Sequence, residues 1–201
     1  GAFLELSGKL AFSTDSFVVS PIFFKGGNIG ELAVFGTVND ISMCGAEPKY
    51  LSLSFIIEEG FSMEDFQKII NSIKLASEKA GVKIVTGDTK VVERGKGDKI
   101  YINTSGIGVI YDNAKIGIEY IKPKQSIIIN RDIASHGMAI MSEREGLKFD
   151  SEILSDTKNL NFEVKKLIEN FGEKIHFLRD ATRGGLASVL NEITFESNLG
   201  I

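Results

Sequence analysis

The chain has 201 residues, enough for one large domain or two small ones. Hydrophobic residues make up 43% and charged residues 25%, a composition that is typical of a folded protein and excludes an intrinsically disordered one. The net charge of −4 argues against a general nucleic-acid binder, and no apolar run approaches the roughly 20 residues that span a bilayer. The single cysteine, Cys44, indicates a reducing compartment. We therefore expect a cytoplasmic protein that binds neither nucleic acid nor membrane.

The amino-terminal part of the chain predicts strands that alternate with helices. Five segments have the apolar patterns of strands: Leu4–Leu6, Leu10–Thr14, Tyr50–Ile57, Val82–Val85 and Ile100–Tyr111. A helix predicted over 28–46 has Asn28 as its cap, ends before Pro48, and contains several small residues that indicate a close neighbour. A second helix runs from its cap Ser62 to Gly81. The order β-β-α-β-α-β-β predicts an α+β fold with a mixed α/β amino-terminal domain.

A second unit is predicted to begin near Glu119, where the hydrophobic pattern pauses before Pro123. We therefore divide the chain into an amino-terminal domain, 1–118, and a carboxyl-terminal domain, 119–201. The second domain is predicted to be α/β and incomplete. Its predicted strand and three helices are Gln125–Asn130, Ser135–Glu145, Phe162–Phe171 and Gly185–Ser197.

Three aspartates stand out in this pattern: Asp15, Asp40 and Asp88, each expected near the point where an element meets a loop. Asp40 also falls inside the apolar helix, where a carboxylate is costly unless it is paired, hydrogen-bonded or bound to a cation. If the three carboxylates converge in the fold, they form a magnesium site that also receives phosphate oxygens. In the alternative, Asp15 and Asp88 are turn residues that bond nearby amides. The spacing leaves both interpretations open.

Three further features have two interpretations each. Lys90 follows Asp88 by two positions, so it either holds an anion or moves a proton beside that carboxylate, or it is an ordinary surface lysine. The loop 179–185 either receives an anion at the start of the following helix, or its Asp180 caps that helix. Cys44, at a helix end with apolar neighbours, is either a small buried residue, which we favour, or a reactive thiol.

Six stretches, in order along nearly the whole chain, resemble the HypE family of hydrogenase maturation factors: Thr14–Val19, Asn39–Pro48, Thr86–Val91, Ser135–Ile140, Arg144–Leu147 and Arg179–Ala187. This family is grouped with aminoimidazole ribonucleotide synthetase and selenophosphate synthetase, which use ATP. The resemblance implies that the amino-terminal domain pairs with a second copy. The two copies would together form a β-barrel, with ATP in the resulting cleft.

The resemblance also implies a reaction. In the family, HypF delivers a carbamoyl group to the thiol of a carboxyl-terminal cysteine, and ATP phosphorylates the carbamoyl oxygen. Loss of phosphate then leaves a thiocyanate, so the net change is a dehydration by a lyase. The cyanide passes through the HypC–HypD complex to the metal centre of the NiFe hydrogenase. The implied cofactors are therefore ATP and Mg²⁺, and the implied partners are a second copy, HypF and HypC–HypD.

The same resemblance implies a Mg²⁺ site and a nucleotide site that share residues. The Mg²⁺ ligands carried over by motif are Asp15, Asp40 and Asp88. The nucleotide-binding residues carried over are Asn39, Asp40, Asp88 and Thr89. Lys90 is expected near the carbamoyl group, where it would assist removal of a proton or departure of phosphate.

The chain departs from the family at both ends. This sequence has no counterpart of the family's glycine-rich amino-terminal segment or of its tail with the acceptor cysteine. Cys44 cannot replace the acceptor cysteine, because Cys44 is expected inside a helix and not on a mobile tail. We therefore expect a piece of a longer dehydratase that does not complete a turnover by itself. The alternatives are a selenophosphate synthetase, an aminoimidazole ribonucleotide synthetase, a thiamine-monophosphate kinase, or a dimeric scaffold without catalytic activity.

Overall fold

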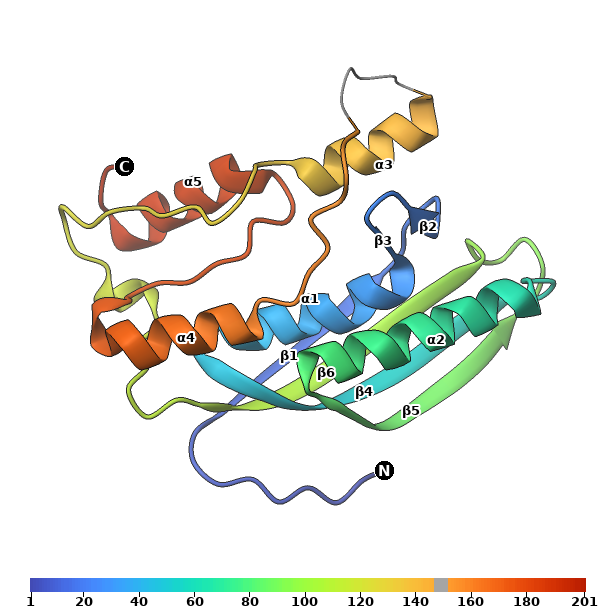
Figure 1. The fold of residues 1–201 in the computed structure, drawn as a ribbon, viewed down its shortest axis with the longest axis horizontal. Helices are drawn as coiled ribbons and strands as arrows, with labels where there is room; N and C mark the ends of the chain where they lie inside the picture. The colour runs from blue at the N-terminus through green and yellow to red at the C-terminus, as the bar shows by residue number, and fades with distance from the viewer. Residues whose placement is uncertain (147–151) are drawn as a thin grey trace.

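The computed structural model of the chain describes residues 1–146 and 152–201, so Leu147, the last residue of one motif, lies outside the described part. A four-stranded sheet with two helices on one face forms its centre (Figure 1). In spatial order the strands are β1 (Leu10–Phe17), β6 (Ile100–Ile110), β4 (Ala46–Glu58) and β5 (Lys83–Val92). β6 is antiparallel to β1 and β4, whereas β4 and β5 are parallel. The expected mixed α/β arrangement is confirmed here.

The two helices lie on the same face of the sheet because their apolar sides meet it. α1 (Ile29–Met43) packs on β1, β6 and β4 and against α2 (Met63–Ala80), which also contacts β5. Most of the largest fully buried apolar side chains come from these helices and from the sheet: Ile29, Ile41, Leu51, Ile69, Ile100 and Ile102. This core holds α1 against the sheet, with Asp40 in the last turns of the helix.

Local chemistry sets both ends of α2 and the start of α1, as predicted. Asn28 Oδ1 accepts hydrogen bonds from two first-turn amides of α1. The Ser62 hydroxyl accepts one from Asp65 N, and Gly81 ends α2 with a left-handed φ of 68°. Each of these groups satisfies backbone atoms that have no partner inside the helix.

The small residues of α1 do have close neighbours. A Cβ on Gly36 would lie 2.7 Å from ring atoms of Phe17 on β1, and a Cβ on Gly30 would lie 2.9 Å from the Ile69 carbonyl oxygen on α2. Real Cβ atoms do not approach that closely, so glycine at these two positions lets α1 lie directly on its neighbours. The prediction of close packing is confirmed.

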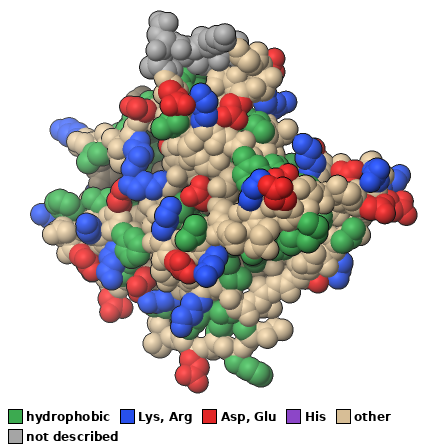
Figure 2. Space-filling model, turned by 45° about the vertical axis from the view of Figure 1, so that its right-hand side comes forward, with side chains coloured by type: hydrophobic (Ala, Val, Ile, Leu, Met, Phe, Trp, Pro, Cys, Tyr) green, Lys and Arg blue, Asp and Glu red, His purple; other side chains and the backbone are tan. Residues whose placement is uncertain are grey.

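The opposite face of the sheet is not covered by a helix in the described part of the chain (Figure 1). On this open face Phe12 is 68% exposed and Leu10 and Ile56 are each 45% exposed. Basic, acidic and hydrophobic side chains are interspersed over the part of the surface drawn in Figure 2. Among the described helices, none is both long and apolar enough to cross a membrane.

The remaining elements surround this unit. A short hairpin of β2 (Phe23–Phe24) and β3 (Gly27–Asn28) precedes α1. The elements after β6 are η1 (Ile118–Tyr120), α3 (Ser135–Glu145), α4 (Asn161–Phe171), η2 (Gly172–Lys174) and α5 (Gly185–Ser197). α4 contacts α1, and α3 contacts β2 (Figure 1). The three helices predicted for this part of the chain are confirmed.

Two predicted strands are wrong. Leu4–Leu6 and Gln125–Asn130 have no regular secondary structure, and Ile128 is 88% exposed. A strand is stable only when another strand satisfies its backbone groups, and no described strand lies beside either segment. The described residues after β6 therefore form helices and connecting segments, in place of the α/β unit that we predicted.

Several element boundaries also differ from the prediction. α1 ends at Met43, because Gly45 takes a φ of 72°, and Pro48 lies inside β4. β5 continues to Val92, well beyond the predicted end at Val85. The sequence of β5 beyond Val85 does not show the apolar pattern of a strand, because β5 is largely polar there and most of its residues are exposed at the edge of the sheet.

Candidate active site

Asp40 lies on the side of α1 that faces β1. The hydroxyl of Ser13 on β1 donates a hydrogen bond to Asp40 Oδ2 at 2.9 Å. Burial raises the pKa of Asp40, and the hydrogen bond from Ser13 partly offsets this effect. The charges of Asp180 and Asp15 raise the pKa further, whereas the Arg179 guanidinium lowers it. Asp40 is therefore the centre of a group of charges that come from three segments of the chain.

Asp180 belongs to the segment between η2 and α5, and burial raises its pKa. The neighbouring Arg179 acts in the opposite direction, and the charge of Asp15 adds to the rise in pKa. Its interpretation as a helix cap is wrong, because Gly184 occupies the cap position of α5 without a side-chain hydrogen bond. The sequence offered one indication that Asp180 lies near a functional site. The stretch 179–185 has glycines and a hydroxyl before a helix, a pattern that can receive an anion.

Asp15 lies within β1, two positions after Ser13, so both side chains point toward α1. Its Oδ1 accepts a hydrogen bond from Ser16 N at 2.7 Å, and the residue is in a strand, not in a turn. Hard carboxylate oxygens suit Mg²⁺, which would relieve the repulsion between these groups. Within residues 1–146 and 152–201, however, no group of three or more His, Cys, Asp or Glu residues is placed to hold a metal ion.

Asp88, Thr89 and Lys90 lie on β5, at the other edge of the sheet. Lys90 Nζ is 2.9 Å from Asp88 Oδ2, and this hydrogen bond lowers the pKa of Asp88. The register with β4 places both side chains on the open face, as predicted from their spacing of two. Neither residue lies in a turn, so the interpretation of Asp88 as a turn residue is wrong.

The predicted magnesium trio is therefore divided within one chain. Asp15 and Asp40 meet between β1 and α1, whereas Asp88 lies on the opposite edge and the opposite face of the sheet. The backbone of two further strands separates the two groups. A site that uses all three carboxylates requires a second chain.

Asn39 turns its side chain away from this cluster. Its Nδ2 donates to the carbonyl oxygen of Lys158 at 2.9 Å, and its Oδ1 accepts from the amide of Leu160 at 2.8 Å. The side-chain amide thus pairs with the backbone that leads into α4. Sequence reasoning had no signal for this contact, because the partners lie about 120 positions apart.

Cys44 occupies the cap position at the carboxyl end of α1 and is exposed, so its interpretation as a buried residue is wrong. Partial burial of the sulfur and the charge of Asp40 raise the pKa of the thiol. Both effects disfavour the thiolate, which is the reactive form.

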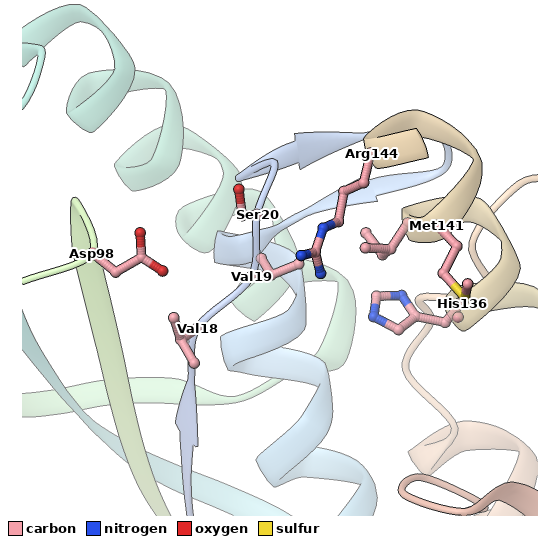
Figure 3. Close-up of a pocket in the computed structure, with 9 residues that line it drawn as sticks. Val18, Val19, Ser20, Asp98, His136, Met141 and Arg144 are labelled. Atoms are coloured by element: carbon pink, nitrogen blue, oxygen red, sulfur yellow. The ribbon is translucent and has the colours of Figure 1, made fainter. Parts of the chain in front are cut away.

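A separate cleft of about 450 Å³ lies between the segment after β1 and α3 (Figure 3). His136 and Arg144 line it from α3, and Ser20 and Asp98 line it from the other side. His136 Nδ1 bonds Ser155 Oγ at 2.9 Å. The lining includes none of the residues predicted to bind the nucleotide or the metal, so the cleft is distinct from the carboxylate cluster.

The comparison with known families decides the relationship. The family model "AIR synthase related protein, N-terminal domain" matches residues 1–110, and the model for the corresponding C-terminal domain matches residues 122–201. The chain belongs to the AIR synthase related family. Its fold, with Asp15, Asp40 and Asp88 on strand, helix and strand, can therefore be compared with members of that family whose structures or activities carry a name.

Relatives of high identity are HypE proteins, which confirms the resemblance seen in the sequence. The chain is 50% identical over 199 residues to carbamoyl dehydratase HypE of Rhizobium leguminosarum bv. viciae, covering 99% of the chain and 57% of that relative. A structure of HypE in complex with ATP is 51% identical with a TM-score of 0.94, over 98% of this chain and 58% of that one.

A structure of a HypE–HypF complex is 55% identical to the chain with a TM-score of 0.92, covering 94% of this chain and 62% of that one. The chain thus spans less than two thirds of the length of these relatives.

Proposed function

We propose that the chain is the ATP-binding part of a HypE-type carbamoyl dehydratase that acts in maturation of the NiFe hydrogenase. The observation that carries this proposal is the close match of the fold to an ATP-bound HypE, with a TM-score of 0.94. In the chain, Asp40 bonds Ser13, and the charges of Asp180 and Asp15 raise its pKa. The negative charges that raise the pKa of Asp40 also attract a cation. A bound Mg²⁺ would in turn bind the phosphate oxygens of a nucleotide.

The proposed reaction converts the S-carboxamide of a carboxyl-terminal cysteine into a thiocyanate. The γ-phosphoryl group of ATP moves to the carbamoyl oxygen, ADP leaves, and the C–O bond then breaks to release phosphate as two protons leave the nitrogen. Phosphate is a far better leaving group than the oxygen of an amide, so ATP makes the dehydration feasible. Lys90, paired with Asp88 on the open face, would assist departure of the phosphate or removal of a proton.

Magnesium belongs to the proposal as the ion that would neutralise the phosphates of ATP. Asp40 would contribute a carboxylate oxygen from one chain, and the charges of Asp15 and Asp180 would help to attract the ion. Phosphate oxygens and water would be further ligands. Asp88 and Thr89 would have to come from a second chain, because β5 lies at the far edge of the sheet.

The proposed active unit is therefore a homodimer whose sheets meet through their open faces. Exposed apolar side chains on that face, Leu10, Phe12 and Ile56, support this arrangement, because contact with a second copy would remove them from water. The edge strand β5 of one copy would then lie near β1 of the other. HypF and HypC–HypD remain proposed partners, and HypF is supported by the complex of a related HypE. A cytoplasmic location is proposed from the single cysteine.

Calorimetric titration with ATP and Mg²⁺ tests the binding part of the proposal. The chain should bind ATP only when Mg²⁺ is present, and Asp40→Ala and Asp88→Ala should each weaken binding by about tenfold or more. Asn71→Ala, on the exposed side of α2, is the matched control and should bind like the original chain. A dimeric scaffold without catalytic activity would bind no ATP, and that outcome would sink the proposal.

Mixing two variants tests whether the site is shared between chains. Chains with Asp40→Ala and chains with Asp88→Ala, combined in equal amounts and allowed to exchange, should recover about one quarter of the sites, since half of the dimers are mixed and each has one intact site. If each site lies within one chain, no site is intact in any combination. Recovery would then be zero, and the dimeric arrangement would be wrong.

Mass spectrometry tests the reaction itself. The longer protein that we propose as the parent, incubated with HypF, carbamoyl phosphate and ATP, should carry a thiocyanate on a carboxyl-terminal cysteine. The chain of 201 residues should remain unmodified, and a modified Cys44 would overturn the expectation that it cannot turn over by itself. Selenophosphate synthetase, aminoimidazole ribonucleotide synthetase and thiamine-monophosphate kinase are less supported alternatives, because the relatives of high identity are HypE proteins.

A further inference from the structure

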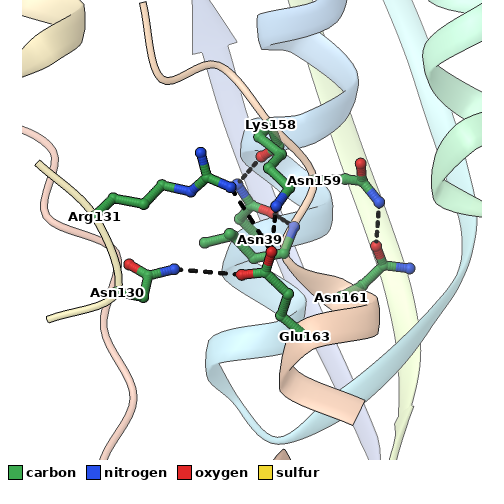
Figure 4. Close-up of polar contacts among 8 residues, drawn as sticks. Asn39, Asn130, Arg131, Lys158, Asn159, Asn161 and Glu163 are labelled. Atoms are coloured by element: carbon green, nitrogen blue, oxygen red, sulfur yellow. Dashed lines mark hydrogen bonds and ion pairs between the residues drawn. The ribbon is translucent and has the colours of Figure 1, made fainter. Parts of the chain in front are cut away.

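Asn39 and Asp40 are consecutive residues of α1 with different surroundings. Successive residues of a helix point about 100° apart, so one side chain faces β1 and the other faces the start of α4. Asp40 bonds Ser13 on β1, and the charge of Asp180 acts on it by raising its pKa. Asn39 bonds the backbone at Lys158, in front of α4 (Figure 4).

The Asn39 side chain contacts the segment before α4 through two hydrogen bonds. One amide group donates to the Lys158 carbonyl oxygen at 2.9 Å and accepts from the Leu160 amide at 2.8 Å. These are the bonds that a neighbouring strand would make, although neither segment is a strand. Turning Asn39 toward a nucleotide would break both bonds and leave partly buried backbone groups without partners.

The segment that Asn39 binds, 158–160, is itself held at the start of α4. The Lys158 ammonium group pairs with Glu163, which also contacts Arg131 and Asn130 (Figure 4). Asn161, the first residue of α4, donates to the last-turn carbonyl oxygen of Ala80 on α2 at 2.8 Å. The start of α4 is thus held by α1, by α2 and by its own ion pairs.

α4 is the element that leads back to the carboxylate cluster. It is followed by η2 and then by the segment that contains Asp180. The far end of α4 is also tied, since Asn113 Nδ2 donates to the Ile168 carbonyl oxygen at 2.9 Å. The contacts of α4 therefore hold the start of the stretch that leads through η2 to Asp180, whose charge acts on Asp40.

We propose that Asn39 is a positioning residue, which docks the segment before α4 on α1 so that Asp180 meets Asp40, and that it is not a ligand of the phosphates. This inference rests on the proposed binding of ATP. It assigns the two residues of the Asn39–Asp40 pair separate tasks: one assembles the site, and the other faces the ligand.

A double-mutant cycle on ATP affinity distinguishes positioning from direct contact. Asn39→Ala should weaken binding of Mg²⁺–ATP by about tenfold, and Asp180→Ala by at least as much. If Asn39 acts through Asp180, the double variant should bind no more weakly than Asp180→Ala alone. Effects that multiply in the double variant, or an Asn39→Ala variant that binds normally, would overturn the proposal.

Amide hydrogen exchange supplies the second readout. In Asn39→Ala the amides of 160–168 should exchange faster by about tenfold or more, while the amides of the sheet keep their protection. Asp40→Ala keeps both hydrogen bonds of Asn39 and should not change amide exchange in 160–168. Asn71→Ala should change amide exchange neither in 160–168 nor in the sheet. Unchanged exchange at 160–168 in Asn39→Ala, together with weaker ATP binding, would indicate a direct contact with the nucleotide and would overturn the inference.

The two experiments also separate this inference from the function on which it rests. If the original chain binds no ATP, the proposed function fails at the first titration, before any variant is compared, and a role in placing an ATP ligand fails with it. If the original chain binds ATP but the effects multiply or the exchange is unchanged, the function stands and only the positioning role is overturned.

Discussion

Asp40 shows at the scale of a single residue how a partly buried carboxylate costs stability. Burial raises its pKa, and the carboxylates of Asp180 and Asp15 add to the rise. A carboxyl whose pKa is higher in the folded state than in the unfolded state favours folding below its ordinary pKa of 3.8. That contribution is lost as the pH rises through the folded-state pKa. At neutral pH the charged Asp40 therefore destabilises the fold.

Asp40→Asn should make the protein more stable and less functional. At pH 7 the melting temperature should rise by roughly 2–4 °C, the change that about 1 kcal/mol brings to a protein of this size, because Asn can still accept the Ser13 hydrogen bond without a partly buried charge. Differential scanning calorimetry from pH 3 to pH 8 checks this, and the difference should vanish below pH 3.8. ATP binding should weaken in the same variant. A lower melting temperature at pH 7 would contradict this account of Asp40.

At the scale of the elements, α1 is placed by one polar residue at its start. Asn28 Oδ1 accepts from Gly30 N at 2.9 Å and from Glu31 N at 3.1 Å, and the Ser72 hydroxyl of α2 donates to the same atom at 2.7 Å. One oxygen thus caps α1 and ties it to α2. The direction of α1 in turn determines where Asp40 meets β1.

Asn28→Ala should cost about 2 kcal/mol of unfolding free energy, at the upper end of the range for a cap, because the Ser72 bond is lost together with the two cap bonds. Urea denaturation followed by circular dichroism measures this difference. Ser62→Ala is the matched control, since that cap makes a single bond to Asp65 and should cost about 1 kcal/mol. Equal costs for the two variants would mean that the bond to α2 contributes nothing.

At the scale of the whole molecule, the sheet has two unlike faces. α1 and α2 cover one face (Figure 1). The other face presents exposed apolar side chains, of which Phe12 at 68% is the most exposed. Apolar side chains on one open face gain free energy when a second surface covers them. The aspartates are divided between the two edges of the sheet. This division also supports the proposed dimer, because a second copy would bring the two edges together.

Phe12→Glu should convert the proposed dimer into a monomer without unfolding it. Light scattering after size-exclusion chromatography should give 22.0 kDa for the variant and twice that mass for the original chain. Leu75→Glu is the control, because Leu75 is 57% exposed on α2, on the other side of the sheet, and should leave the mass unchanged. A Phe12→Glu variant that stays dimeric would rule out the open face as the interface.

Much of the fold could be predicted from short stretches of sequence. The caps Asn28 and Ser62 and the end at Gly81 act on amides a few residues away, so their effect is visible in the local sequence. The alternation of β6 is equally local, because its residues point in turn to the buried and the open face. The strand predicted at 125–130 failed because strand formation depends on a partner, and the local pattern does not contain the partner.

The sequence by itself determined the helices, most of the sheet, the family resemblance and the aspartates as candidates. Only the tertiary structure decided that Asp180 joins Asp40, that Asn39 turns to Lys158, and that Asp88 lies at the far edge. The physical reason is the range of each effect. Caps and periodicity act over a few residues, whereas burial, charge and pairing bring together side chains up to about 140 positions apart, at distances that depend on how the whole chain packs.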